Sequence, residues 1–311
     1  MSKLFSKDDF RDNCGFGLIA DINGIKSHKI INKSINALRS MTHRGAIGAD
    51  GKTGDGCGLL LNLDKDFFKN AISEEQGVEI SNEFAIGQLF TNHKIESVLS
   101  KIEKILKSEN LILKAVRPVP VNKDILGTIA SSCLPNIYQL FIQSSDKVFY
   151  EEKFETNLYQ ARKLIEEIYL DDEQLYFCSL SSKTIIYKGL MLPDAIQDFY
   201  LDLKSSKFES SICVFHQRFS TNTHPRWHLA QPFRLLAHNG EINAIRGNRN
   251  WVKARSSKFK SPRLPKIQEF KQLVNETGSD SSALDNMIEI LLNGGVKLFL
   301  SLIHISEPTR R

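Results

Sequence analysis

The pattern of apolar and polar positions along the chain predicts strands and helices in mixed order. Apolar residues that recur every three or four positions indicate amphipathic helices, and short apolar or alternating runs indicate strands. The expected strands are a segment that starts at or near Cys14, and 59–63, 137–143, 175–180, 184–187, 212–219 and 233–237. The expected helices are a segment with Ile31, Ile35, Leu38 and Met41, then 97–106, 157–170, a segment from Ile242 to Val252, and 280–293. Because these elements show no regular βαβ repeat, their order favours an α+β layered fold.

Glycines mark the places where some of these elements end. Gly45 follows the first expected helix and is typical of a helix stop. The stretch 45–58 is so rich in Gly, Asp and Thr that it predicts an irregular loop. Gly294 and Gly295 follow the last expected helix, where they predict a C-terminal cap.

The composition is that of an ordinary globular protein. The chain has 311 residues, 41% of them hydrophobic and 25% charged, which allows a substantial core. The net charge of +5 is spread along the chain without a basic stripe, so the sequence does not indicate nucleic-acid binding. No apolar run approaches the roughly 20 residues of a membrane span, and residues 1–13 lack the apolar segment of a secretory signal.

The cysteines favour a reducing, cytoplasmic compartment. There are five of them, far apart and without a Cys-x-x-Cys pair, which disfavours both a disulfide framework and a zinc site. We therefore expect no metal site in this chain.

Cys14 is a candidate nucleophile. A thiol needs a base to form the reactive thiolate near neutral pH, and the sequence shows no histidine in a local arrangement with it. Removal of residues 1–13 would give Cys14 a free α-amine with a pKa of about 7.7 to 8.0, which suits a general base. The alternative is that Cys14 is a small buried hydrophobic residue, as most cysteines are.

The segment His238-Asn239-Gly240-Glu241 is a candidate oxyanion hole. An asparagine side-chain amide and the backbone N–H of a following glycine can both donate to a developing oxyanion, each contributing about 10²- to 10³-fold in rate. Asn-Gly is also a common hairpin turn, so the pair alone does not decide between these interpretations.

Two further segments carry charges that suit an α-amino acid. Arg218, in the run 216–221, could clamp a carboxylate in a bidentate pair or could form an ordinary surface salt bridge. Asp280, in the run 278–281, could bind an ammonium group, and this run also reads as a helix N-cap. A nucleophile, an oxyanion hole and clamps for carboxylate and ammonium together describe a site that attacks the side-chain amide of an amino acid.

The wording of these motifs resembles the class II, N-terminal-nucleophile glutamine amidotransferase domain of glutamate synthases. The matching runs are CGFG from Cys14, THRGAIGADGKTGDGCG from Thr42, HQRFSTNTHPRW from His216, LAQPFRLLAHNGEINAIRGNRNW from Leu229 and GSDSSALDN from Gly278. The resemblance implies the following roles: Cys14 as the nucleophile, Asn239 and Gly240 as the oxyanion hole, Arg218 with Thr221 nearby for the glutamine carboxylate, and Asp280 for its α-amine. It also implies a four-layer αββα sandwich of two antiparallel sheets.

The resemblance further implies how the chain is organised. Residues 1–13 would be a propeptide, 14–300 the amidotransferase domain, incomplete at its C-terminal end, and 301–311 a tail that does not match. The substrate would be L-glutamine, and the ammonia would pass to 2-oxoglutarate in a synthase domain of the same longer chain. No cofactor is expected in this chain. FMN, a 3Fe–4S cluster and a small electron-donating subunit are implied only for the full-length enzyme.

Two other interpretations remain open from the sequence. Amidotransferases of the amidophosphoribosyltransferase or glucosamine-phosphate synthase type share the cysteine and the Asn-Gly turn, but they lack the loop of Thr42 to Gly58 and the long stretch 64–209. A non-catalytic module that keeps residues 1–13 would bind glutamine without turnover. The intact mass of the protein separates this module from an enzyme.

Overall fold

The computed structural model describes residues 15–170, 174–217, 224–240 and 242–298 of the chain. Within these ranges, eight strands form two four-stranded sheets, and every pairing between neighbouring strands is antiparallel. The first sheet has the order β1 (Phe16–Ala20), β8 (Ile212–Gln217), β2 (Cys57–Asn62), β7 (Thr184–Gly189). The second has the order β4 (Leu111–Pro118), β5 (Asn136–Ser144), β3 (Phe84–Thr91), β6 (Leu175–Ser181).

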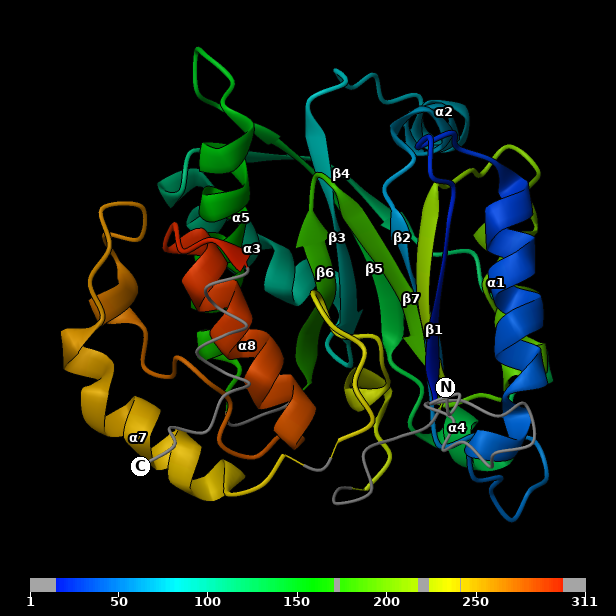
Figure 1. The fold of residues 1–311 in the computed structure, drawn as a ribbon. Helices are drawn as coiled ribbons and strands as arrows, with labels where there is room; N and C mark the ends of the chain where they lie inside the picture. The colour runs from blue at the N-terminus through cyan, green and yellow to red at the C-terminus, as the bar shows by residue number, and fades with distance from the viewer. Residues whose placement is uncertain (1–14, 171–173, 218–223, 241, 299–311) are drawn as a thin grey trace, which may run out of the picture.

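Helices lie outside both sheets (Figure 1). The α-helices are α1 (His28–Ser40), α2 (Lys65–Gln76), α3 (Ile95–Ser108), α4 (Thr128–Ser132), α5 (Glu151–Ile168), α6 (Ile196–Phe199), α7 (Ile245–Arg255) and α8 (Asp280–Asn293). Short 3₁₀ turns are η1 (Thr42–Arg44), η2 (Lys123–Ile125), η3 (Pro193–Ala195), η4 (Leu201–Lys204), η5 (Trp227–Leu229), η6 (Ser256–Lys258) and η7 (Ile267–Glu269).

The apolar residues of each helix explain the layers. The buried positions of α3 and α5, such as Ile102 and Leu158, pack against Leu89 and Leu140 of the second sheet. On the opposite side, the buried stripe of α1 joins the core of the first sheet. Each fully buried side chain of this size contributes about 1.5–3 kcal/mol. The order helix, sheet, sheet, helix is the predicted αββα sandwich, which is thereby confirmed (Figure 1).

Most of the predicted elements are present, with shifted ends. The last helix, α8, has the predicted bounds 280–293, and Gly295 after it takes the left-handed φ of +90°. By contrast, α5 begins at Glu151, six residues before the predicted start, because two acidic residues favour its first turn and Phe154 is buried. The strands β3 and β4 and the helix α2 were not predicted.

One prediction about local structure is wrong, and another holds for a different physical reason. Residues 233–237 form no strand; they are an irregular segment in which the N–H of Leu235 donates to the Asp285 side chain instead of to a neighbouring strand. Gly45 does follow a helical turn, but its φ of −105° is open to any residue. A side chain at Gly45 would collide with the Gln217 amide and Asp55, so the glycine serves a close approach of chain segments.

Candidate functional site

The described part of the chain contains three of the six predicted site residues: Asn239, Gly240 and Asp280. The other three, Cys14, Arg218 and Thr221, lie outside the described residues. Their immediate neighbours in sequence are described, because Gly15 precedes β1 and Gln217 is the last residue of β8.

Gly15 and Gln217 lie side by side. The N–H of Gln217 donates to the carbonyl oxygen of Gly15, which extends the pairing of β1 with β8 by one step. A Cβ atom on Gly15 would lie closer than 3.0 Å to the Gln217 carbonyl oxygen, so only glycine fits at this position. The sheet thus brings together the residue after Cys14 and the residue before Arg218.

Asn239 reaches the same place from a segment far along the chain. The N–H of Gly15 donates to Oδ1 of Asn239 over 3.0 Å. Since a backbone N–H can only donate, this contact fixes which end of the Asn239 amide is the oxygen. The NH₂ group therefore points away from Gly15, held in one orientation, as a donor to an oxyanion must be.

The turn that carries Asn239 is held from both sides. The side chain of Gln231 pairs with the backbone of His238, accepting from its N–H over 2.9 Å and donating to its carbonyl oxygen over 2.6 Å. Gly240 has a φ of +90°, which favours glycine. This geometry explains why glycine follows Asn239.

The N–H of Gly240 donates to Nδ1 of His238 over 3.0 Å. The ring therefore accepts at Nδ1, which places the proton of a neutral His238 on Nε2. The hydroxyl of Ser281 lies 3.1 Å from the same Nδ1. To act as an oxyanion donor, Gly240 must exchange its bond to His238 for one to the substrate.

Asp280 is the first residue of α8 and joins this helix to the turn. Its Oδ2 accepts from the N–H of Ile242 over 2.8 Å, and its Oδ1 accepts from the N–H of Ser281 over 2.6 Å. The helix is capped by the preceding residue, since Oγ of Ser279 accepts from the N–H of Ser282 over 3.1 Å. Capping and the carboxylate of Asp280 are therefore separate features, as the sequence allowed.

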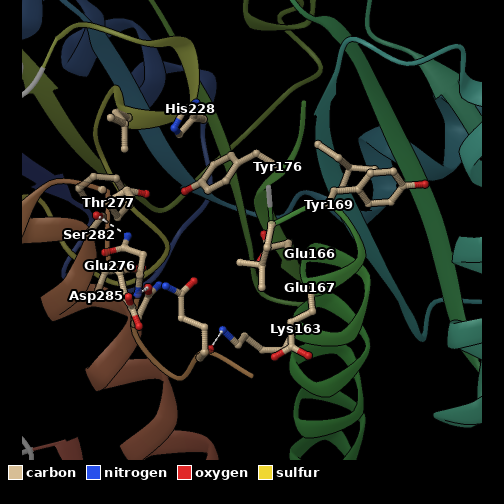
Figure 2. A pocket seen from close by; sticks show the side chains of 18 of the residues that line it. Lys163, Glu166, Glu167, Tyr169, Tyr176, His228, Glu276, Thr277, Ser282 and Asp285 are labelled. Atoms are coloured by element: carbon tan, nitrogen blue, oxygen red, sulfur yellow. Dashed lines mark hydrogen bonds between the residues drawn. The ribbon is translucent and has the colours of Figure 1, made fainter. Parts of the chain in front are cut away.

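A cavity of about 800 Å³ opens between α5 and α8 (Figure 2). It is lined by Lys163, Glu166 and Glu167 from α5, by Glu276, Thr277, Ser282 and Asp285 from α8 and the segment before it, and by Tyr169, Tyr176 and His228 (Figure 2). Of the predicted site residues that are described, none lines it. Gly278 and Ser282 do line it, so the cavity wall includes residues on both sides of Asp280 in sequence.

Arg234 holds the segment before the turn against this wall. Its Nη2 donates to Glu166 over 2.9 Å and to the carbonyl oxygen of Phe177 over 2.8 Å. The next residue, Leu235, donates its N–H to Oδ1 of Asp285 over 2.9 Å. Burial, with Glu289 next to it, raises the pKa of Asp285 to about 7, and the Arg234 guanidinium opposes this rise. Sequence reasoning missed this anchor, although acidic residues on the buried side of α8 were a signal for it.

His228, which lines the cavity, and Lys188, which contacts His228, have strongly shifted pKa values. Burial, followed by the charges of Lys188 and Arg226, lowers the pKa of His228 to about 3, so this ring is neutral at pH 7. Burial also lowers the pKa of Lys188 to about 8, and its Nζ donates to the carbonyl oxygen of His228 over 2.8 Å.

The described ranges contain neither a metal-binding cluster nor a membrane-spanning helix. No group of three or more His, Cys, Asp or Glu side chains there is arranged to hold a metal ion. The four described cysteines are all free thiols, and burial raises the pKa of three of them, Cys57, Cys178 and Cys213. No helix in these ranges is both long and apolar enough to cross a membrane.

Comparison with known proteins identifies the family to which these motifs belong. The sequence pattern described as "Glutamine amidotransferases class-II" matches residues 14–309. The chain is 38% identical over 301 residues to the NADPH glutamate synthase large chain of Azospirillum brasilense. It is 40% identical over 294 residues to the ferredoxin-dependent glutamate synthase 1 of Arabidopsis thaliana, and 39% identical over 310 residues to the NADH glutamate synthase of Saccharomyces cerevisiae.

These alignments include nearly all of the chain but a small part of each relative. They cover 94%, 92% and 95% of the chain, and 20%, 18% and 14% of the three relatives respectively. The chain therefore spans a fifth or less of the length of these relatives.

Proposed function

We propose that this chain, which belongs to the class II glutamine amidotransferase family, hydrolyses the side-chain amide of L-glutamine with Cys14 as the nucleophile. The observation that carries the proposal is the hydrogen bond from the Gly15 N–H to Oδ1 of Asn239. It holds an oriented amide donor against the residue next to Cys14, where an oxyanion formed on attack would need it.

The proposed chemistry begins with removal of residues 1–13. The freed α-amine of Cys14, with a pKa of about 7.7 to 8.0 in an unperturbed chain, takes the thiol proton directly or through one water. The thiolate adds to the amide carbon of glutamine, and the amide oxygen becomes an oxyanion that accepts from the Asn239 NH₂. Loss of such a donor typically costs about 10²- to 10³-fold in rate.

Collapse of this intermediate breaks the carbon–nitrogen bond. The leaving nitrogen takes the proton held on the Cys14 amine and departs as ammonia, leaving a thioester. The same amine then accepts a proton from a water molecule, whose oxygen attacks the thioester carbon. Glutamate is released, and the proton returns to the sulfur of Cys14. The reaction consumes one water and needs no oxidant or reductant.

Recognition of the amino-acid end is assigned to the charged residues. Arg218, with Thr221 nearby in sequence, binds the glutamine carboxylate in this proposal, and Asp280 binds the α-ammonium. Each oxygen of Asp280 already accepts from a backbone N–H, and a carboxylate has about four acceptor positions. The carboxylate is thus fixed in place yet keeps capacity for the ammonium. At the same step, Gly240 exchanges its bond to His238 for one to the oxyanion.

The wider role follows from the relatives, which are glutamate synthases. We propose that the domain supplies ammonia to a synthase domain of a longer cytoplasmic chain, where 2-oxoglutarate becomes glutamate with electrons from a small subunit. FMN and an iron–sulfur cluster would serve that domain. The four described cysteines are free thiols that form no metal-binding group, so they do not fit an iron–sulfur cluster.

A glutamine-like diazoketone tests the proposal. The purified protein is treated with the reagent, and its peptides are mapped by mass spectrometry. We expect one adduct, on a peptide that begins at Cys14, and protection by glutamine. Cys133 is an exposed thiol and serves as the internal control, because it should react with iodoacetamide and not with the diazoketone. An adduct elsewhere, or none on a protein that begins at Cys14, would contradict the proposal.

A further inference from the structure

We infer that Arg249 is a positioning residue that holds the Asp280 carboxylate where it binds the α-ammonium of the substrate. The inference rests on the proposed function, since it assigns Arg249 a part in binding glutamine. It concerns a residue on α7, the helix that follows the Asn239–Gly240 turn.

The helix α7 contacts the core with two partly buried apolar residues, Ile245 and Val252. It buries none of its residues, and Figure 1 shows it at the edge of the molecule, beside the lower end of α8. The chain enters it through Ala244, which has a left-handed φ of +55° that costs a non-glycine residue about 1 kcal/mol or more. A polar contact with a fixed direction adds precision that this limited apolar packing does not provide.

Arg249 supplies that contact. Its Nη2 donates to the carbonyl oxygen of Gly278 over 2.6 Å and to that of Ser279 over 3.1 Å. The same nitrogen lies 3.3 Å from Oδ1 of Asn275. Both carbonyls belong to the residues directly before Asp280, so the guanidinium fixes the backbone from which the carboxylate projects.

Two contacts join α7 and the residues before it to the start of α8. Ile242, before α7, donates its N–H to Oδ2 of Asp280, and Arg249, within α7, binds the carbonyls before Asp280. Without the arginine, the exposed pair of Lys253 and Glu276 still joins α7 to the segment before α8, but nothing in α7 binds the two carbonyls next to Asp280. The backbone from which the Asp280 carboxylate projects would then be less firmly fixed.

Charge adds to this geometry. Burial lowers the pKa of Arg249, and the negative charges of Asp280 and Glu276 act in the opposite direction. These two carboxylates therefore favour the charged form of the partly buried guanidinium. Lysine could supply the charge, but its compact ammonium cannot reproduce the planar set of donors.

The test compares two substrates. L-glutamine carries the α-ammonium, and glutaramate has the same amide and carboxylate without it. Arg249→Gln and Arg249→Lys are measured beside Arg246→Gln, an exposed arginine on the same helix. We expect the KM for glutamine to rise about 10-fold or more in Arg249→Gln with kcat largely kept, as for loss of charge-assisted contacts. Arg249→Lys should be intermediate, and Arg246→Gln should match the parent.

With glutaramate, the three variants should match the parent, because the ammonium clamp is not used. Equal losses on both substrates would show a general structural role and overturn the inference. A parent that hydrolyses both substrates equally well would also overturn it, while leaving the amidase proposal intact. A parent that releases ammonia from neither would refute the proposed function itself. If Arg249→Gln does not fold, Arg249→Lys carries the comparison.

Discussion

Replacing Gly15 by alanine should disable the site by a single added methyl group. The new Cβ would lie closer than 3.0 Å to the carbonyl oxygen of Gln217 and 3.3 Å from Oδ1 of Asn239. The first of these atoms is backbone in a paired strand, so the start of β1 must move away by roughly 1 Å. A displacement of that size at reacting groups can cost about 10²-fold in rate. The same shift breaks the bond from the Gly15 N–H to Asn239.

The loss in activity should exceed the loss in stability. Overpacking of this kind costs about 1–3 kcal/mol, and the affected residues lie at the end of an edge strand. We therefore expect Gly15→Ala to fold, with ammonia release from glutamine reduced about 100-fold or more. Initial rates and thermal unfolding of the processed protein measure the two effects separately.

Gly247→Ala is the matched control. It adds the same methyl group within α7, where nothing lies within 4 Å of the new Cβ, and should leave the activity unchanged. Helix propensity predicts a gain of about 0.5–1 kcal/mol. Parent-like activity in Gly15→Ala would refute the reasoning, because the start of β1 would then tolerate a shift without effect on the site.

Three further predictions concern single side chains. Cys14→Ser should abolish ammonia release from glutamine, since a serine alkoxide is far harder to form, and parent-like release would exclude the thiolate mechanism. Asp280→Ala should raise the KM for glutamine while α8 persists, because Ser279 still caps the helix. Steady-state kinetics measure the KM and circular dichroism measures the helix content; an unchanged KM or a loss of helix would contradict this prediction. The pKa of Asp285 is about 7 in the folded protein, above the ordinary 3.8, so the folded state binds this proton more tightly than the unfolded state does. The free energy of unfolding should therefore fall as the pH rises from about 4 towards 7. Urea titrations across this range should show the fall in the parent and not in Asp285→Asn, and identical pH profiles would contradict the assignment.

The elements that were predicted well carry their signal locally. The helix α8 has an apolar stripe, a serine cap and terminal glycines, all readable from its own residues. The strand β3 was missed because all eight of its residues are buried, which removes the alternation that marks a half-exposed strand. The run 233–237 is apolar like a strand, but its backbone is held by the side chains of other segments, which a local pattern does not show.

For the candidate site, too, the sequence predicted local features and missed contacts between distant segments. The sequence motifs indicated Asn239 and Asp280 by their residue types, and the structure brings Asn239 to the neighbour of Cys14. The contacts that orient them, from Gly15 and Arg249, join positions far apart along the chain. Neither hydrophobic periodicity nor the spacing of residues within a motif encodes such pairs, because they depend on how the two sheets pack. The proposed catalytic and binding residues are therefore easier to infer than the residues that hold them in place.

The two sheets differ in when they can form during synthesis. All four strands of the second sheet come from one continuous stretch, 84–181, whereas the partner of β1 among the described strands is β8, which lies about 190 residues later. At the usual ~5–20 residues per second, a ribosome needs roughly 10–40 s to make that interval. The segment that leads into the site therefore waits unpaired until most of the domain exists. Phe16 and Leu18, which remain exposed even after pairing, are available throughout that wait to any chaperone that recognises apolar strands.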